Sequence, residues 1–353
     1  MRGSLRALAA FVFAAVSASA VEFPAAEWPR AEPRSQGVDP ALLRHALEGW
    51  RAATGKHGTD RAVIVRRGAV IYEGPQAGRP QNLWSATKSF TSTVLGLLIA
   101  EKKVALDTRA AAIEPLLRAR YPAVTLRHFA TMTSGYSAPG STRWNEVSED
   151  WSREPYVPGP PLFAPGTRYA YWDEAQMMFG RVLTRAAGAD LLEYLGRRVF
   201  EPIGMRVRGW DLEGEVDGIP IRNGCTGIRV DALNLARFGH LFLNEGRWAG
   251  RQLVPAEWVR AATRPQVPAD LPLADTDRRS IDGRGVYGFN WWVLPGAPVR
   301  AYYAAGLNHN ICLVIPAWEM AIVRLGEDGN PPAGHAAVLR ELLARLAPAL
   351  AKD

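Results

Sequence analysis

The chain has 353 residues, of which 48% are hydrophobic and 22% are charged, a balance typical of a globular protein with one large domain or two ordinary ones. Its formal net charge is +7, but the basic residues are scattered without a run of five or six, which argues against nucleic-acid binding. The six histidines show no metal-ligand spacing and no CxxC or HExxH occurs, so the sequence implies no metal and no organic cofactor.

Residues 1–20 have the pattern of an export signal. Arg2 and Arg6 precede a short apolar stretch over 7–16, and Ala18-Ser19-Ala20 fits a small-residue cleavage site. The apolar stretch is too short to span a bilayer, and no cysteine follows the cleavage site to carry a lipid. We expect an exported protein, periplasmic or secreted, without stable membrane insertion; an uncleaved anchor is the alternative.

The first structural elements after this segment are a helix and a hairpin. Asp39 is a good helix cap, and Pro40 suits the first helical position. Apolar residues then recur at helical spacing, at Leu42, Leu43, Ala46, Leu47 and Trp50. The following stretch RAVIVRRGAVIYEG consists of two β-rich runs around Arg67-Gly68, which predicts a hairpin.

The middle of the chain, from about 90 to 258, has mostly helical periodicity. One helix is predicted to start at Asp231 and to end at Gly246. Between Pro139 and Pro165 lies a long irregular segment that contains Trp144 and Trp151, and long irregular segments in compact domains often serve function.

The end of the chain repeats the elements of its start in reverse order. A strand pair is predicted over 311–326, followed by a helix whose apolar side carries Ala337, Leu339, Leu342, Leu343 and Leu346. The fold class is therefore α/β, of the α+β type: an antiparallel sheet from both termini, flanked by helices, with an inserted helical subdomain. We expect one domain over 21–353, with its α/β part at about 33–88 and 286–353 and its mainly helical part at about 89–285.

Ser85 and Lys88 form the pattern that carries chemistry. On a helix that starts near Ser85, positions three apart share a face, so the amine can contact the hydroxyl. The helix body is apolar, which desolvates the amine, lowers its pKa and suits it to act as the base that a serine nucleophile needs. The alternative is a helix-capping serine beside a surface lysine, the better interpretation of an isolated Ser-x-x-Lys.

Further motifs stand in order downstream. WSATKSFTSTVLGLLIAEKKVALD resembles the opening of serine β-lactamase-like and penicillin-binding-protein-like hydrolases, and most closely the class C branch with its esterases, D-amino-acid peptidases and oligomeric-amide hydrolases. VTLRHFATMTSGY, PGTRYAYWDEAQMMFGRVL, LNLARFGHLFLNEGRWAGRQLVPAEWV and YYAAGLNHN are similar to later blocks of that branch. The resemblance covers about residues 33–345 and implies a β-lactamase/transpeptidase-like fold.

The resemblance also implies roles for single residues. Ser85 matches the acylated nucleophile, Lys88 its base, and Tyr171 the tyrosine that relays a proton to the leaving group and helps activate water. The backbone N–H groups of Ser85 and Leu307 would form the oxyanion hole, with Gly306 at a strand edge that the substrate approaches closely. Taken alone, Tyr171 is better interpreted as a core aromatic residue whose hydroxyl is satisfied; its place after Pro165-Gly166-Thr167 and the presence of Ser85 favour the catalytic role.

One departure from the family lies in the second motif. Tyr171-Trp172-Asp173 stands where the family has Tyr-Ser-Asn. An ionised Asp173 would hold Lys88 protonated and oppose a phenolate on Tyr171, so either the carboxyl is protonated or the proton relay is rebalanced. We therefore predict that Asp173→Asn keeps or raises activity; Asp173 facing solvent or Arg168 is the alternative.

The other departure lies in the third motif, where Ala304 replaces the cation that binds a substrate carboxylate in β-lactamases and peptidases of this fold. This favours a neutral ester or amide, unless His309 or an arginine substitutes. Ala305 and Trp172 are further candidates for substrate contacts, and His309 fits either the site or a turn cap. Five tryptophans are considered for an aromatic wall around an apolar acyl group, the first three preferred: Trp144, Trp151, Trp172, Trp291 and Trp292.

The sequence predicts an exported serine hydrolase acting through an acyl-enzyme on Ser85, and it favours an esterase or amidase for small neutral acyl compounds. The alternatives are a β-lactamase or D,D-peptidase, whose substrate would be a lactam or a peptide with a carboxylate end, and a catalytically weak homologue that binds cell-wall material. No Gly-x-Ser-x-Gly occurs, which argues against an α/β-hydrolase. The sequence leaves open the oligomeric state and whether Cys225 and Cys312 form a disulfide or remain buried thiols.

Overall fold

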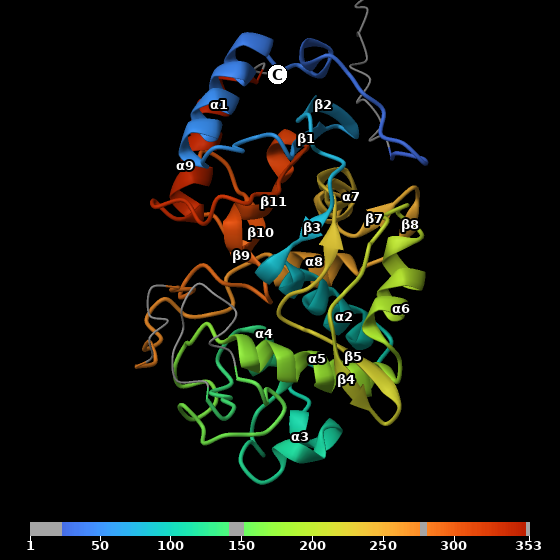
Figure 1. The fold of residues 1–353 in the computed structure, drawn as a ribbon, viewed down its shortest axis with the longest axis vertical. Helices are drawn as coiled ribbons and strands as arrows, with labels where there is room; N and C mark the ends of the chain where they lie inside the picture. The colour runs from blue at the N-terminus through green and yellow to red at the C-terminus, as the bar shows by residue number, and fades with distance from the viewer. Residues whose placement is uncertain (1–22, 141–151, 276–280, 351–353) are drawn as a thin grey trace, which may run out of the picture.

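A computed structural model describes residues 23–140, 152–275 and 281–350. Its centre is a six-stranded sheet, seen along the strands in Figure 1. The strands are β1 (Ala62–Arg66), β2 (Ala69–Glu73), β9 (Trp292–Val293), β10 (Tyr302–Gly306), β11 (Asn310–Ile315) and β12 (Met320–Arg324). They lie in the order β2-β1-β12-β11-β10-β9, and every neighbouring pair is antiparallel. The predicted fold class is confirmed.

Both predicted strand pairs form, and the two ends of the chain meet in the sheet. Arg67 and Gly68 turn the first hairpin with φ of 50° and 86°, the left-handed conformation that a tight hairpin turn requires. Pairing of β1 with β12 places Ala62 opposite Arg324, so the N-terminal and C-terminal hairpins become one sheet. The prediction of a single sheet built from both termini is confirmed.

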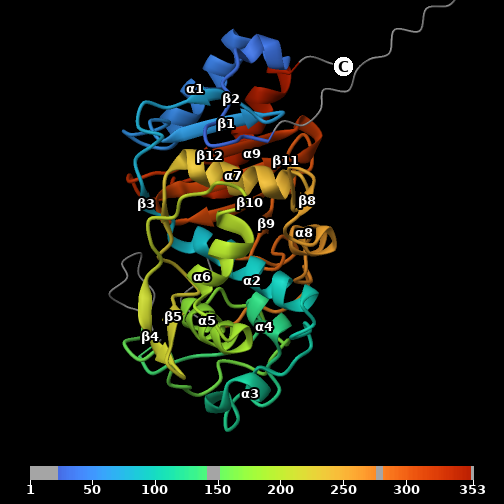
Figure 2. The ribbon, with the colours of Figure 1, turned by 90° about the vertical axis from the view of Figure 1, so that its right-hand side faces the viewer.

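One face of the sheet is covered by the terminal helices α1 (Pro40–Ala53) and α9 (His335–Leu346), which run side by side in Figures 1 and 2. The Asp39 carboxylate caps α1 by accepting the N–H groups of Ala41 and Leu42 at 2.8 and 3.0 Å. Leu42, expected on the buried side, is instead 39% exposed, because the buried stripe begins one residue later. The residues of this layer from α1 are Leu43, Ala46, Leu47 and Trp50.

The opposite face is covered by α7 (Ala232–Leu243), which lies against the sheet and runs in nearly the same direction as its strands in Figure 2. Asp231 caps it by accepting the N–H of Asn234 at 2.8 Å, as predicted. Gly239 lets the helix approach the sheet, since a Cβ there would lie 2.9 Å from the sulfur of Cys312 on β11. Helix α7 ends at Leu243, three residues before the predicted stop at Gly246.

The inserted part of the chain contains the remaining helices and several short strands. The helices are α2 (Lys88–Ala100), α3 (Ala110–Ile113), α4 (Leu126–Ala130), α5 (Asp173–Ala187), α6 (Leu191–Leu195) and α8 (Ala256–Ala262). The short strands are β3 (Gln81–Asn82), β4 (Leu212–Val216), β5 (Ile219–Arg222), β6 (Arg229–Val230), β7 (Arg247–Trp248) and β8 (Arg251–Gln252). Single helical turns are η1 (Pro33–Gln36), η2 (Trp84–Thr87), η3 (Pro115–Leu117), η5 (Gly196–Phe200), η6 (Leu307–His309), η7 (Pro316–Trp318) and η8 (Ala347–Ala349). The helical character of this part was predicted, whereas its strand pairs β3–β6, β4–β5 and β7–β8 were not.

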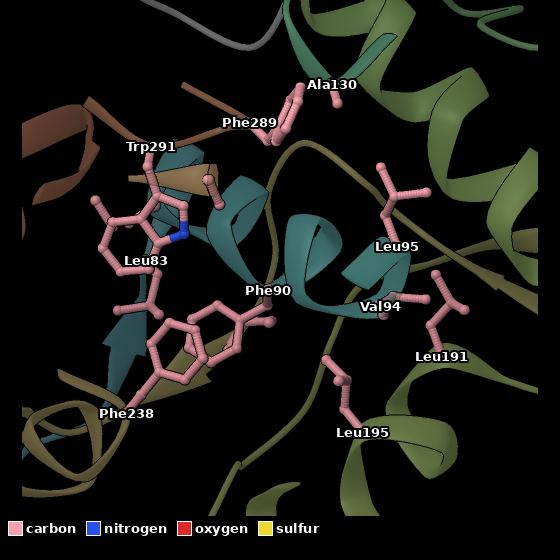
Figure 3. Close-up of a cluster of buried hydrophobic side chains, with 14 of the residues drawn as sticks. Leu83, Phe90, Val94, Leu95, Ala130, Leu191, Leu195, Phe238, Phe289 and Trp291 are labelled. Atoms are coloured by element: carbon pink, nitrogen blue, oxygen red, sulfur yellow. The ribbon is translucent and has the colours of Figure 1, made fainter. Parts of the chain in front are cut away.

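Helix α2 runs through the middle of the molecule and is buried on all sides, as Figure 3 shows. Phe90 stacks on Phe238 of α7 with ring centroids 4.0 Å apart, while Val94 lies toward Leu191 and Leu195. A helix that is apolar on all sides can exist only inside a core, which explains why its first residue is also buried.

No helix among the described residues is long and apolar enough to span a membrane. Cys225 and Cys312, both described, are free and buried.

Candidate active site

The serine lies in a strained turn directly before α2. Trp84, the residue before Ser85, has φ of 51°, a left-handed conformation that is unfavourable for a large side chain. The carboxamide oxygen of Asn82 holds this turn by accepting the Trp84 N–H at 2.9 Å. Such local strain persists only where surrounding contacts fix it, and it is common at functional sites.

Ser85 and Lys88 are in contact, as the spacing predicted. Lys88 Nζ lies 2.7 Å from Ser85 Oγ, and the lysine side chain is 1% exposed. The amine also lies 2.8 Å from Oδ1 of Asp173, the first residue of α5 and itself 6% exposed. Burial is the largest single effect and disfavours the ammonium form, but the Asp173 carboxylate, together with Cys225, Tyr171 and Tyr287, outweighs it. The pKa of Lys88 therefore lies well above its ordinary value. In its resting state the site therefore contains a buried ammonium–carboxylate pair.

Cys225 is a third group at this amine, and no pattern in the sequence predicts its position there. Its sulfur lies 3.3 Å and its carbonyl oxygen 3.4 Å from Lys88 Nζ. Asn223 fixes the loop by accepting the Cys225 N–H at 2.9 Å, and Thr91 of α2 donates to the Gly224 carbonyl at 2.8 Å. Burial and the nearby Asp173 carboxylate raise the pKa of the Cys225 thiol well above its ordinary value, so it stays a protonated thiol.

Tyr171 completes the polar cluster. Its hydroxyl hydrogen-bonds with Ser85, and Lys88 Nζ lies 4.8 Å from the centroid of its ring. Burial raises the pKa of Tyr171 above its ordinary value, and Lys88 and the Ser85 hydrogen bond only partly oppose this. The phenol is therefore protonated at rest. Ser85, Lys88 and Tyr171, predicted as a set, lie together.

Two further aromatic residues lie against Tyr171. Trp292 is half-buried and stacks on the Tyr171 ring at 5.9 Å, while Tyr287 meets it edge-on at 6.3 Å. Two serines of α2 hold this segment: Ser89 and Ser92 donate to its backbone carbonyls at 2.8 and 2.6 Å. As a candidate for the aromatic wall around an acyl group, Trp292 was ranked behind three other tryptophans, and its position next to Tyr171 shows that this ranking was wrong. Only the path of residues 287–293 beneath α2 brings it to the site.

The third motif lies on β10, beside the turn that holds the nucleophile. A Cβ on Gly306 would lie 2.0 Å from the Leu83 carbonyl oxygen and 3.1 Å from the Ser85 nitrogen, so only glycine allows this approach. Leu307 follows directly, next to the Ser85 backbone. Ala304 is 2% exposed and packs in the core on the α2 and α7 side. Ala305 packs on the opposite face, with α1 and α9, so its side chain does not serve as the expected substrate contact.

Two other predicted contacts are also absent. His309 is fully buried on the α1 and α9 side, where its ring contacts Trp50 and lies 2.8 Å from His335 (Nδ1 to Nδ1). Trp172 packs in the main core, because successive side chains of an extended segment point in opposite directions and Tyr171 takes the site-facing one. These two expectations were wrong. Trp144 and Trp151 lie outside the described residues.

Asp173 faces Lys88 rather than solvent or Arg168, whose guanidinium donates to the Leu273 carbonyl at 3.2 Å. Within the described residues, no group of three or more His, Cys, Asp or Glu side chains is placed to hold a metal ion.

Comparison with known proteins agrees with this architecture. A family model described as Beta-lactamase matches residues 43–345. The esterase EstB of Burkholderia gladioli is 28% identical over 196 residues, covering 46% of this chain and 50% of that protein. A Beta-lactamase of Pseudomonas fluorescens is 24% identical over 175 residues, covering 48% of each. The match thus spans about half the length of these two relatives.

Among solved structures, a putative 6-aminohexanoate-dimer hydrolase from Bacillus anthracis superposes with a TM-score of 0.68 at 20% identity, covering 91% of this chain and 87% of that one. A penicillin-binding protein homologue from Caulobacter crescentus has a TM-score of 0.66 at 17% identity, covering 89% and 99%. At these identities the superpositions show a shared fold. Together with the family match over 43–345, they establish that the chain belongs to the beta-lactamase family.

Proposed function

We propose that the protein is a serine hydrolase that forms an acyl-enzyme on Ser85 and cleaves small, neutral acyl esters or amides. The observation that carries this proposal is the 2.7 Å contact between Ser85 Oγ and Lys88 Nζ inside a buried polar cluster. A hydroxyl is a weak nucleophile by itself, and a positioned base three residues along the chain supplies what it lacks.

The first chemical step needs a base, and an ammonium cannot serve as one. Asp173 lies 2.8 Å from Lys88 Nζ, so a lysine proton can move to the carboxylate and leave a neutral amine beside Ser85. That amine accepts the Ser85 proton while Oγ attacks the substrate carbonyl carbon. A C–O bond forms and the carbonyl electron pair moves to its oxygen, where the backbone N–H groups of Ser85 and Leu307 would stabilise the charge.

Collapse of this intermediate needs a proton on the leaving group. Tyr171 interacts with both Ser85 and Lys88, so in this proposal its hydroxyl donates its proton to the departing oxygen or nitrogen and regains one from Lys88. The bond to the leaving group breaks and the acyl group remains on Ser85. Water then attacks the ester by the same steps in reverse, which releases the acid and restores Ser85.

The surroundings of the site favour an uncharged substrate. Ala304 is an uncharged core residue at the position where the family carries a cation for a substrate carboxylate, and His309, the substitute considered from the sequence, faces the far side of the sheet. Trp292 is half-buried and is supported by Tyr171 and Tyr287, so this aromatic cluster next to the nucleophile suits an apolar acyl group. The similarity to an esterase supports the same substrate class.

Three probes separate this proposal from its alternatives: a fluorophosphonate, a p-nitrophenyl ester series and a chromogenic cephalosporin. We expect covalent mass on the Ser85 peptide and ester turnover, both lost in Ser85→Ala. Ser92→Ala is the matched control, because this buried hydroxyl of the same helix donates to the Phe289 carbonyl at 2.6 Å, away from Lys88. Cephalosporin turnover at comparable efficiency would instead support a β-lactamase or D,D-peptidase. A folded protein whose Ser85 resists labelling would support a cell-wall-binding homologue.

Export is part of the proposal and rests on residues 1–20, which lie outside the described residues. Fractionation of cells that express the full chain, with N-terminal sequencing of the product, tests it. Cleavage after Ala20 is expected.

A further inference from the structure

The turn after Gly306 is held in an unusual backbone conformation. It connects β10 to β11 through Leu307–His309, and Asn308 and His309 have φ of 65° and 56°. Two consecutive residues other than glycine in the left-handed region are unfavourable, and histidine has less local compensation there than asparagine. This turn begins with Leu307, whose N–H is the second proposed oxyanion donor, so the contacts that fix the turn also orient that donor.

A single guanidinium fixes the turn from below. Arg324 ends β12 and is fully buried. Its Nη1 donates to the carbonyl oxygens of Asn308 and His309 at 2.8 and 3.1 Å. Its Nε and Nη2 donate to the carbonyls of Gly58 and Thr54 at 2.6 and 2.8 Å. The guanidinium fork, meaning the three nitrogens of Arg324, thus joins the turn to the loop that follows α1. One of these nitrogens, Nη1, binds the carbonyl oxygens of both left-handed residues.

The space around this fork is closed. A Cβ on Gly326 would lie 2.0 Å from the Asn308 carbonyl oxygen and 2.1 Å from Arg324 Nη1, so the neighbouring chain position must be glycine. Burial lowers the pKa of Arg324 to about 10, which leaves it charged at neutral pH. A buried guanidinium loses its hydration and is retained only where its protein hydrogen bonds replace it.

Two more side chains of the turn are anchored. The His309 ring accepts from Trp50 Nε1 at 3.4 Å and pairs with His335 at 2.8 Å, which ties the turn to α1 and α9. Asn310 donates to the Asn82 carbonyl at 3.1 Å, two residues before the strained Trp84 of the nucleophile turn. The turns that supply the two proposed oxyanion donors are therefore fastened to each other as well.

We infer that Arg324 and His309 are positioning residues for the oxyanion hole: they hold the 307–309 turn so that the Leu307 N–H faces the substrate oxygen. Neither side chain touches Ser85, Lys88 or Tyr171 in any recorded contact among the described residues. The inference rests on the proposed function, since it assigns these residues to its acylation step. It requires that their loss lowers kcat rather than substrate binding.

The test compares two buried arginines. Arg324→Lys keeps the charge and removes the fork. Arg237→Lys is the matched control: this guanidinium of α7 is 3% exposed and donates to the carbonyls of Ala25, Ala26 and Ile203 at 3.0, 2.7 and 2.8 Å, in segments that contain none of the proposed catalytic residues. Both variants are to be measured for thermal unfolding, kcat and KM on a p-nitrophenyl ester, and rate of fluorophosphonate labelling, with rates normalised to folded protein.

We expect Arg324→Lys to lower kcat and the labelling rate by about 10- to 100-fold with KM within about threefold, since complete loss of one oxyanion donor costs about 10² to 10³. Arg237→Lys should lose stability to a similar degree and keep kcat within about twofold. Equal kcat for the two variants would overturn the inference while leaving the proposed function intact. A wild-type protein that neither turns over esters nor is labelled would overturn the proposed function, and this inference with it.

If Arg324→Lys does not unfold cooperatively, its kcat cannot be assigned to a folded protein, and His309→Asn then provides the test of the inference. Asparagine tolerates the left-handed conformation, so this variant keeps the turn and removes only the ring contacts to Trp50 and His335. A fall in kcat of at least about fivefold is expected. His240→Asn, which replaces a fully buried histidine of α7 that packs against Trp28 and Trp248, should not cause it. Equal kcat in these two variants would again contradict the inference.

Discussion

Replacing Asp173 by asparagine isolates the most unusual interaction of the site. In the native protein the carboxylate lies 2.8 Å from Lys88 Nζ, and the two side chains are 6% and 1% exposed. Asparagine keeps the shape and removes the charge. Burial alone lowers the pKa of a lysine by as much as about 3–5 units, so we expect Lys88 to release its proton near neutral pH in this variant.

The expected loss of stability follows from the same numbers. Removing one partner of a buried ion pair costs about 3–5 kcal/mol. The loss at pH 7 has an upper bound near 4.6 kcal/mol, because the folded variant can always relieve the unpaired charge by releasing the lysine proton. For an ordinary lysine pKa of about 10.4, this release costs about 1.36 kcal/mol for each pH unit between pH 7 and the pKa. For a domain of this size, the melting temperature should fall by about 5 °C.

The pH dependence of stability should change sign. In the native protein the pKa of Lys88 lies above its unfolded value, so the pair's contribution is full below about pH 10 and is lost only as pH rises through the folded pKa. In the variant the folded pKa lies below the unfolded value. Its unfolding free energy should therefore rise between about pH 7 and pH 10, because deprotonation of the unfolded chain becomes less costly.

Activity should be kept or raised, because the amine no longer has to pass a proton to Asp173 before it can accept one from Ser85. The acid limb of kcat/KM should move to lower pH. The measurement is the pH–rate profile of p-nitrophenyl ester hydrolysis from pH 5 to 10. The concentration of active sites is determined separately by titrating a sample of the protein with fluorophosphonate. Asp190→Asn is the control, since Asp190 is 7% exposed and pairs with Arg222 at 2.6 Å outside the polar cluster. Loss of turnover in well-folded Asp173→Asn, or an unmoved acid limb, would refute this reasoning.

Three further changes have defined outcomes. Gly306→Ala should lower kcat by at least about 10²-fold, because the added methyl group would collide with the turn that holds Ser85. Gly78→Ala is the control: no atom lies within 4 Å of its added Cβ, so kcat should be unchanged. Equal changes of kcat in the two variants would contradict the prediction. Trp292→Ala should raise KM about tenfold for esters with large apolar acyl groups and leave acetyl esters within about twofold, and a uniform change across the ester series would argue against an acyl surface. The free energy of unfolding, measured in urea, should fall by at least about 3 kcal/mol from pH 7 to pH 4. Burial lowers the pKa of His335 to about 4 and that of His309 well below its ordinary value, so only the unfolded chain takes up protons; His335→Gln should reduce this fall, and an unchanged pH dependence would exclude the pair as its cause.

Local signals in the sequence were enough to predict the frame of the molecule. Asp39 and Asp231 cap the helices that follow them, and the Arg67–Gly68 turn closes the first hairpin, because caps and tight turns depend on neighbouring residues. The contact of Ser85 with Lys88 was predictable for the same reason, since one helical turn fixes it.

The rest of the site depends on contacts between distant segments. Cys225 lies against Lys88 because Thr91 and Asn223 hold the loop that carries it, and nothing near Cys225 in the sequence indicates this. His309 was placed near the site on account of its motif, but the left-handed turn at Asn308 and His309 directs its ring to the opposite face of the sheet. A motif specifies which segment approaches the nucleophile, whereas the backbone turn specifies which side chain faces it.

The pairing of β1 with β12 also has a consequence for synthesis. The ribosome completes Ser85 and Lys88 long before it reaches Gly306 and Arg324, yet β1 has no neighbour on one side until β12 has been made. A sheet that joins the two ends of a chain forms late and folds slowly, because a long loop must close before its contacts form. A nascent or unfolded chain therefore carries the nucleophile and its base without the strand that completes the site.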